Sequence, residues 1–272
     1  MTKGYVFDNA WQEERHRLDA LETTWDAWTI RNLEAVGVAE GWRCLEAGAG
    51  GGSIVSWLCR RVGTAGYVLA TDLDTRLLDV IVERNLEVRR HDITVDELEP
   101  GAYDLVHARL VLEHLPEHER VLKRMGTALK PGGWLVVEEF DHTTFRPDPE
   151  CPKEDRLVWD AWLAAFHRLA EERGLDLIYG SRLYGLLQRL GLDAVSAEGC
   201  TVAERGGSES RQLLLLSVLK LRDELTATGK IDDEGISRML SLLRDPDFSW
   251  TSQSMVSARG RRLPSAPSFA SG

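Results

Sequence analysis

A glycine-rich turn between a predicted strand and a predicted helix is the first place where this chain could hold a ligand. Residues 46–53 read EAGAGGGS and follow a short apolar run. Gly48 and Gly50 allow positive φ and a close approach of the backbone to a ligand, and the helix start behind them offers free N–H groups. Such a loop alone is weak support for a binding site, because tight packing also favours glycine.

Asp72 strengthens the interpretation of this loop. It ends the next predicted strand, about 20 residues further on, where a carboxylate can accept hydrogen bonds from both hydroxyls of a ribose. The alternative is that Asp72 caps a following helix, although Asp74 is the better placed cap. Together, the loop and Asp72 indicate a nucleoside cofactor.

Two residues of the loop favour S-adenosylmethionine over a dinucleotide. Glu46 lies two residues before the first glycine, where it disfavours a pyrophosphate but can meet a cationic amino group. Ser53 departs from the dinucleotide pattern G-x-G-x-x-G/A, and the sequence contains no Tyr-x-x-x-Lys pair. A nicotinamide-dependent oxidoreductase is therefore the less favoured alternative.

The elements that must position these residues alternate along the chain. We expect strands at 42–47, 67–71, 86–90, 103–108, 134–140, 193–203 and 248–258, and helices at 8–36, 54–62, 75–84, 117–129, 155–173, 180–190, 208–227 and 232–244. This order predicts an α/β fold with a doubly wound, Rossmann-like, mostly parallel sheet. Several strands are unbroken apolar runs, which indicates a sheet covered on both faces.

The organisation changes after Phe140, where two helical patterns follow each other without a strand. We therefore expect an N-terminal helical cap (1–37), a cofactor-binding core (38–140), a helical lid insertion (141–192), the remainder of the core with a second helical insertion (193–258), and a disordered tail (259–272). Such insertions can form a lid over the active edge of the sheet.

Composition narrows the class of protein and its partners. The 272 residues include 33 Lys and Arg against 44 Asp and Glu, a net charge of −11, which disfavours a nucleic-acid partner. The four cysteines form no C-x-x-C pair, and the N-terminus has no apolar signal region. We expect a cytoplasmic protein without a membrane span that acts on a small molecule, and the oligomeric state stays open, with a homodimer as one option.

Five motifs in order make the chain resemble the class I S-adenosylmethionine-dependent methyltransferases. They are EAGAGGG at 46–52, ATD at 70–72, HDI at 91–93, YDLVHAR at 103–109 and LKPGGWLVV at 129–137. The resemblance covers about residues 40–140 and is greatest to small-molecule methyltransferases of ubiquinone-type and bacterial natural-product pathways. It implies a seven-stranded sheet in the order 3-2-1-4-5-7-6, with the last strand antiparallel and supplied by 248–258.

The resemblance also assigns cofactor-binding positions. It implies that Glu46, Gly48 and Gly50 line the methionine and ribose part, that Asp72 holds the ribose hydroxyls, that Asp92 and Ile93 lie at the adenine, and that Ala108 and Arg109 lie near the sulfonium. Ala47 and Leu73 are also expected to bind the cofactor. For Asp92 the alternative is a turn cap, and for Arg109 it is a structural ion pair.

Two histidines are candidates for removing a proton from the acceptor. His114 is the first, because it follows the fourth strand, and His142, which leaves the fifth strand at the same edge, is the second. Their alternatives are a packing or capping histidine and a histidine of a solvent-exposed loop. The nearby Glu139 and Asp141 do not form a ligand motif with His142, so we expect no metal.

Aromatic residues outside the motifs leave the acceptor open. Trp159, Trp162 and Phe166 form a stripe at helical spacing that either floors a pocket for an aromatic or polyketide-like acceptor or belongs to the ordinary core. Similarly, Tyr5, Phe7 and Trp11 either close over the cofactor or only pack. The leading hypothesis is methyl transfer to an O, N or C atom of a small organic acceptor in secondary metabolism. The alternatives are cyclisation or decarboxylation by an S-adenosylmethionine-binding enzyme, and a binding protein on the same fold.

Overall fold

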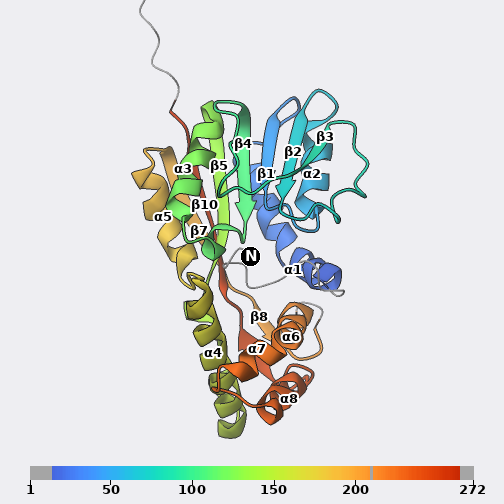
Figure 1. The fold of residues 1–272 in the computed structure, drawn as a ribbon, viewed down its shortest axis with the longest axis vertical. Coiled ribbons are helices and arrows are strands. Elements are labelled where there is room, and N and C mark those ends of the chain that lie inside the picture. The colour runs from blue at the N-terminus through green and yellow to red at the C-terminus, as the bar shows by residue number, and fades with distance from the viewer. Residues whose placement is uncertain (1–13, 209–210, 264–272) are drawn as a thin grey trace, which may run out of the picture.

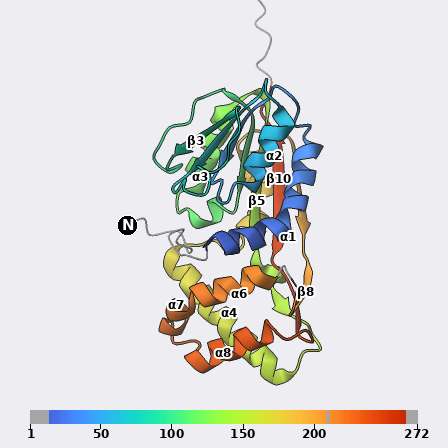
Figure 2. The same cartoon turned by 90° about the vertical axis from the view of Figure 1, so that its right-hand side faces the viewer.

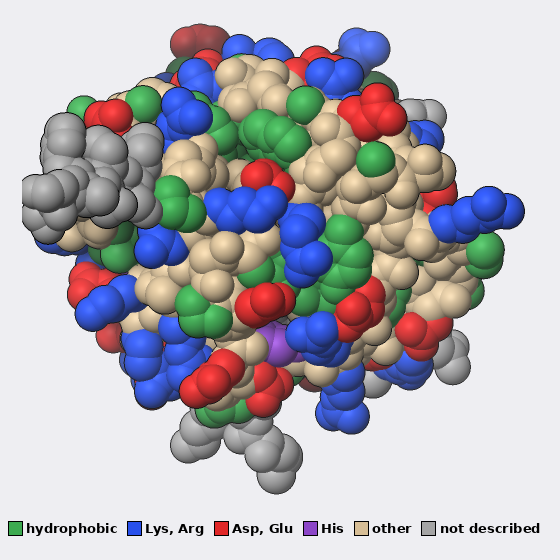
Figure 3. Space-filling model, turned by 90° about the horizontal axis from the view of Figure 1, so that it is seen from above, with side chains coloured by type: hydrophobic (Ala, Val, Ile, Leu, Met, Phe, Trp, Pro, Cys, Tyr) green, Lys and Arg blue, Asp and Glu red, His purple; other side chains and the backbone are tan. Residues whose placement is uncertain are grey.

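The computed structural model describes residues 14–208 and 211–263, so Tyr5, Phe7, Trp11 and the end of the predicted tail lie outside the described residues. Figure 1 shows an α/β core above a second, mainly helical part, which we call the lid. None of the described helices is long and apolar enough to cross a membrane. On the end of the core that faces away from the lid, acidic and basic side chains are interspersed (Figure 3).

The core is built on a seven-stranded sheet in the order β3-β2-β1-β4-β5-β10-β7. Its strands are β1 (Arg43–Ala47), β2 (Tyr67–Asp72), β3 (Leu86–Arg90), β4 (Tyr103–Arg109), β5 (Leu129–Asp141), β7 (Asp193–Cys200) and β10 (Ser254–Arg261). The first five run parallel, whereas β10 runs antiparallel to both β5 and β7. The predicted α/β class and the strand order 3-2-1-4-5-7-6 with an antiparallel last strand are thus confirmed.

Helices cover both faces of this sheet. They are α1 (Glu14–Ala35) and α2 (Ser53–Val62) on one face, and α3 (His118–Ala128) and α5 (Tyr179–Arg189) on the other. Fully buried side chains such as Leu58 of α2 and Leu183 of α5 belong to two separate apolar clusters, one for each face. Burial on both faces explains why the strands are apolar without alternation.

The lid contains α4 (Lys153–Arg173), α6 (Arg211–Lys220), α7 (Arg222–Ala227) and α8 (Asp233–Leu242). The lid also contains a small sheet in the order β6-β9-β8, which is formed by β6 (Arg146–Pro147), β9 (Ser249–Thr251) and β8 (Ala203–Arg205). Figure 2 shows α1 between the core and α6, where Lys220 Nζ lies 2.6 Å from Glu14 Oε2. Thus α1 contacts both parts of the molecule.

Several predicted elements were wrong. Residues 75–84 form turns instead of a helix, and Val80 and Val82 are largely exposed there (76% and 94%). Because β-branched residues favour helices poorly and this segment buries little apolar surface, a helix gains too little stability. The predicted helix 208–227 is two helices, α6 and α7. The predicted strands 193–203 and 248–258 are each divided into one strand of the main sheet and one of the small sheet. The predicted helix 180–190 is present as α5 (Tyr179–Arg189), and it packs on the main sheet.

Gly180 fixes how closely α5 approaches the sheet. A Cβ atom at this position would lie 2.7 Å from the backbone oxygen of Glu139. We therefore expect Gly180→Ala to lower the free energy of unfolding by about 1–3 kcal/mol in urea denaturation. The control is Gly185→Ala in the same helix, where a Cβ meets only the flexible end of Arg189. This substitution should stabilise the protein by about 0.5–1 kcal/mol, and equal effects of the two would contradict the packing argument.

Candidate functional site

A cavity lies at the carboxyl ends of the core strands, between the core and the lid. All of the predicted site residues except Ala47 and Ala108 line it. Those two are fully buried in β1 and β4, so they lie behind the cavity wall. The parallel strands bring the others together, because their carboxyl ends meet at one edge of the sheet.

The glycine loop adopts the backbone conformations that glycine allows. Gly48, Gly50 and Gly52 have φ of 68°, 55° and 88°, and a Cβ on Gly48 would lie 2.3 Å from Cγ2 of Val111. The loop is held by Gly48 N–H and Ala49 N–H, which donate to the Thr71 carbonyl at 2.8 and 3.0 Å. The loop is thus preformed and close to the strand ends.

Asp72 and Asp92 are both held by backbone hydrogen bonds at the cavity edge. Asp72 accepts from Gly50 N–H at 2.9 Å and from Asp74 N–H at 3.0 Å, while burial raises its pKa. Asp92 accepts with Oδ1 from the amide and the hydroxyl of Thr94, at 2.9 and 2.6 Å. Asp92 is therefore a turn cap that also lines the cavity. A carboxylate has about four acceptor positions, so both residues can accept further hydrogen bonds.

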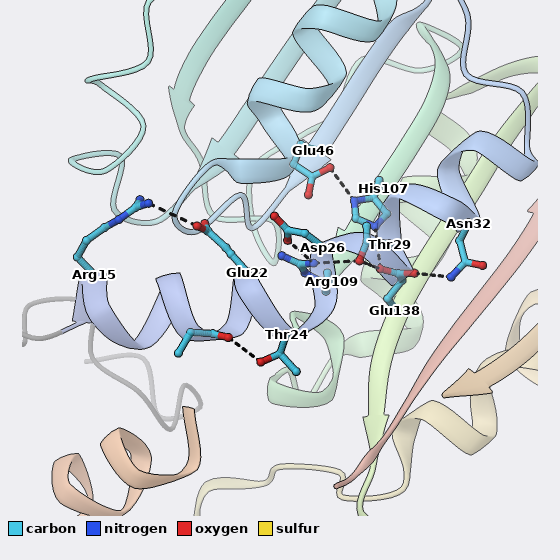
Figure 4. A network of polar contacts seen from close by, with 11 residues as sticks. Arg15, Glu22, Thr24, Asp26, Thr29, Asn32, Glu46, His107, Arg109 and Glu138 are labelled. Carbon is cyan, nitrogen blue, oxygen red and sulfur yellow. Dashed lines mark hydrogen bonds and ion pairs between the residues drawn. The ribbon is translucent and has the colours of Figure 1, made fainter. Parts of the chain in front are cut away.

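Glu46 belongs to a buried charged network that the sequence analysis missed (Figure 4). Its Oε2 lies 2.7 Å from Nδ1 of His107, while Nε2 of the same ring lies 3.6 Å from Oε2 of Glu138. The second distance is too long for a hydrogen bond but short enough for an ion pair. Glu138 also accepts hydrogen bonds from Thr29 Oγ1 and, at 3.1 Å, from Asn32 Nδ2 on α1.

The network fixes the charges of His107 and Glu138. Burial lowers the pKa of His107, but the charges of Glu46 and Glu138 outweigh burial and raise it to about 9. Burial raises the pKa of Glu138, but the nearby charge of His107, the hydrogen bond from Thr29 and the charge of Arg109 outweigh burial and lower this pKa to about 2. His107 is thus an imidazolium between two carboxylates at neutral pH.

Arg109 connects the same network to α1. Its Nη1 donates to Thr29 Oγ1 at 2.9 Å and lies 2.9 Å from Oδ1 of Asp26. Arg109 therefore forms the structural ion pair that was the alternative to a role beside the sulfonium, and its side chain also lines the cavity.

The two candidate bases line the cavity and are buried. Burial, with the nearby charge of Arg17, lowers the pKa of His114 to about 3. Burial and His167 lower the pKa of His142 to about 3 as well. Because His142 is only 9% exposed, it is not a solvent-loop histidine. Both rings are neutral at pH 7, and a neutral imidazole has one nitrogen that can accept a proton.

Two further buried carboxyl groups hold His114 in place. Glu139 Oε1 accepts from the backbone amides of Val111 and Leu112 at 3.1 and 2.7 Å, at the start of the short 3-10 helix Leu112–His114. Glu113 in turn accepts from the Phe140 amide at 3.2 Å. Burial raises the pKa of both carboxyl groups, and that of Glu139 reaches about 8. These reciprocal bonds attach the helix that carries His114 to β5.

The family follows from a match over more than half of the sequence. Residues 11–197 match the model of the methyltransferase domain family. The chain belongs to this family. The predicted class I S-adenosylmethionine-dependent fold and cofactor are thereby confirmed.

Individual relatives cover the chain in part. Methyltransferase str2 of Strobilurus tenacellus is 35% identical over 130 residues, which are 46% of this chain and 45% of the relative. A ubiquinone biosynthesis O-methyltransferase of Burkholderia ambifaria is 31% identical over 143 residues, 49% of this chain and 56% of the relative. The chain thus matches about half the length of these curated relatives.

A solved structure shows the same fold over nearly the whole chain. Geranyl diphosphate C-methyltransferase from Streptomyces coelicolor, in complex with Mg²⁺, geranyl diphosphate and S-adenosyl-L-homocysteine, has a TM-score of 0.51 and 15% identity. The alignment covers 94% of this chain and 86% of that one. The lid is therefore included in the structural similarity.

Proposed function

We propose that the protein transfers a methyl group from S-adenosylmethionine to an O, N or C atom of a small organic acceptor in secondary metabolism. The observation that supports this most strongly is the composition of the cavity. Its core side combines the glycine loop with Glu46 and Asp72, and its lid side is formed mainly by aromatic and aliphatic side chains. A polar cofactor and an apolar acceptor would thus meet at the carboxyl edge of the sheet.

The residues of the core side fit the cofactor. Glu46 is 3% exposed, lines the cavity, and bonds His107 through Oε2, so Oε1 would accept hydrogen bonds from the α-amino group. Gly48 lines the cavity and packs so closely on Val111 that a side chain there would collide with it, so its bare backbone would lie beside the methionine part. Asp72 would hold the ribose hydroxyls, and Asp92 with Ile93 the adenine. Leu73 would contact the ribose, and Arg109 would lie near the sulfonium.

The chain contributes positioning, exclusion of water and proton removal. S-adenosylmethionine supplies a methyl group activated on a sulfonium. The lid would hold the acceptor atom in line with that methyl and keep water out, which lowers the entropic part of the barrier. His114 would take the proton of a hydroxyl or ammonium acceptor as it reacts, with His142 as the second candidate.

The predicted organisation and location are part of this proposal. Residues 1–37 would act as a cap, 38–140 as the cofactor-binding core, and the helical insertions as the acceptor side, with the lid insertion of 141–192 contributed by α4. All four cysteines are free thiols, as expected in a reducing cytoplasm.

Calorimetric titration tests the cofactor-binding residues. We expect micromolar binding of S-adenosylmethionine and S-adenosylhomocysteine and no binding of NADH. Glu46→Gln and Asp72→Asn should each weaken binding about 10- to 100-fold, because each removes hydrogen bonds to a charged group. The control Glu34→Gln changes an exposed carboxylate of α1 and should leave binding unchanged. Binding of NADH alone, or wild-type affinity in both site variants, would contradict the proposal.

Chemistry without methyl transfer is the second candidate. A [4+2]-cyclase, SpnF, has a TM-score of 0.51 to this chain at 16% identity, so the fold is also found in a cyclase. Transfer of a labelled methyl group to an organic product distinguishes the two, because a cyclase would leave the label on the cofactor.

A further inference from the structure

The lid side of the cavity is an aromatic wall that continues from the core. His142 lies next to Phe166, with ring centroids 5.6 Å apart, and Phe166 is stacked with Trp162 at 5.9 Å and 13°. Phe145 meets the edge of Trp162 at 5.6 Å. Trp250 of β9 lines the same cavity from the small sheet. This wall offers flat apolar faces to whatever enters from the cofactor side.

One carboxyl group interrupts the aromatic surface. Glu204, in the middle of β8, is 9% exposed and lines the cavity. Its register partner is Trp250, so both side chains project from the same face of the small sheet. The neighbours of Glu204 in β8 are exposed, as expected for a strand with one buried face.

Glu204 has no partner within the described chain. Across residues 14–208 and 211–263, no hydrogen bond or ion pair reaches its carboxyl group. Burial alone accounts for the rise of its pKa to about 7. A buried carboxyl group without a hydrogen-bond partner is costly, and such a group usually meets a ligand or water.

We propose that Glu204 is an acceptor-binding residue that accepts a hydrogen bond from a hydroxyl group of an aromatic acceptor, whose ring lies against Trp162, Phe166 and Trp250. This inference rests on the proposed function, because it takes the lid side of the cavity as the acceptor site.

Charge selects a neutral hydroxylated ring over charged acceptors. An anionic acceptor would be repelled by the ionised Glu204 carboxylate. A cationic acceptor would be repelled by the positive sulfonium of the cofactor. A neutral aromatic ring with a hydroxyl group satisfies the carboxylate and packs on the aromatic wall.

Calorimetry with two matched probes at pH 8.5 tests the proposal. Protein saturated with S-adenosylhomocysteine is titrated with 2-naphthol, which carries a hydroxyl donor, and with 2-methoxynaphthalene, which does not. We expect Glu204→Ala to weaken 2-naphthol binding about 10- to 100-fold, as for a hydrogen bond to a charged group. Binding of 2-methoxynaphthalene should change less than about threefold, because it depends only on the aromatic wall.

Two further variants separate hydrogen bonding from folding. Glu204→Gln retains a hydrogen-bond acceptor and should lose less affinity for 2-naphthol than Glu204→Ala. Glu234→Gln, on the exposed side of α8, should behave as wild type. The urea midpoint of Glu204→Gln should be equal to or above that of wild type, because the variant removes a buried unpaired acid.

The proposal is overturned if 2-naphthol does not bind wild-type protein, binds wild type and Glu204→Ala alike, or loses no more affinity than 2-methoxynaphthalene. A preceding titration with S-adenosylhomocysteine distinguishes failure of the Glu204 proposal from failure of the proposed function. If this ligand binds and 2-naphthol does not, only the role of Glu204 fails. If this ligand does not bind, the proposed function fails, and the role of Glu204 fails with it.

Discussion

His107→Gln is expected to lower the free energy of unfolding by about 3–5 kcal/mol, measured by urea denaturation at pH 6. The imidazolium of His107 lies between Glu46 and Glu138, and all three side chains are buried. Glutamine keeps a hydrogen-bond donor but removes the positive charge. The two carboxylates then stay in a low-dielectric environment without it, which is the costly way to break a buried ion pair.

The pH dependence identifies the charge as the cause. The pKa of His107 rises from 6.5 to about 9 on folding, so its contribution is complete below pH 6.5 and is lost as pH rises through about 9. The pKa of Glu138 falls from 4.5 to about 2, so its contribution is present above pH 4.5 and is lost as pH falls through about 2. The difference between wild type and His107→Gln should therefore be largest between about pH 4.5 and 6.5, shrink as pH rises from about 6.5 to 9, and be lost above about pH 9.

His16→Gln is the matched control, because His16 is exposed on α1. Its effect should stay within about 0.5 kcal/mol of zero at every pH. If the difference in free energy of unfolding between wild type and His107→Gln stays constant up to pH 10, packing and not the imidazolium charge is the cause of the lost stability. His107→Gln should also bind S-adenosylhomocysteine more weakly than wild type, because His107 orients the carboxylate of Glu46.

The core of the fold was predictable because its signals are local. Most strands of the core, such as β2, β4 and β5, contain a short apolar run, and parallel strands with right-handed crossovers permit few topologies. The failures have equally local causes. Residues 75–84 contain apolar residues at helical spacing, yet Val80 and Val82 are exposed. The strands of the small sheet have only two or three residues, too few to show a period of two.

The site was predictable where its residues lie in motifs at strand ends, and less so where they depend on tertiary contacts. His107 was missed, although a histidine inside the apolar strand 103–109 is a signal in itself. With the predicted order placing β1 beside β4, Glu46 and His107 become register partners. Glu204 carried no such signal, because only the pairing of β8 with β9 places it in the cavity.

His114→Ala is expected to lower turnover about 10²- to 10⁴-fold with S-adenosylhomocysteine affinity unchanged. The test uses an acceptor found by screening hydroxylated aromatic compounds with labelled methyl. The ring of His114 lines the cavity, and its backbone is held through the hydrogen bonds of Glu139 to the start of its short helix. Loss of the imidazole thus removes a positioned proton acceptor without disturbing the cofactor side.

The pH profile of kcat/KM in the Glu204→Gln variant separates His114 from an ordinary histidine base, because this variant removes the titration of Glu204, whose pKa is about 7. Because burial and Arg17 lower the pKa of His114 to about 3, the base stays deprotonated and kcat/KM should be flat down to about pH 5. An unperturbed histidine would lose activity below about pH 6.5. His142→Ala is the matched control, because His142 is also buried in the cavity wall with a pKa of about 3. If His142→Ala causes the larger loss of turnover, the proton passes to His142; if neither variant changes the rate, positioning alone carries the reaction.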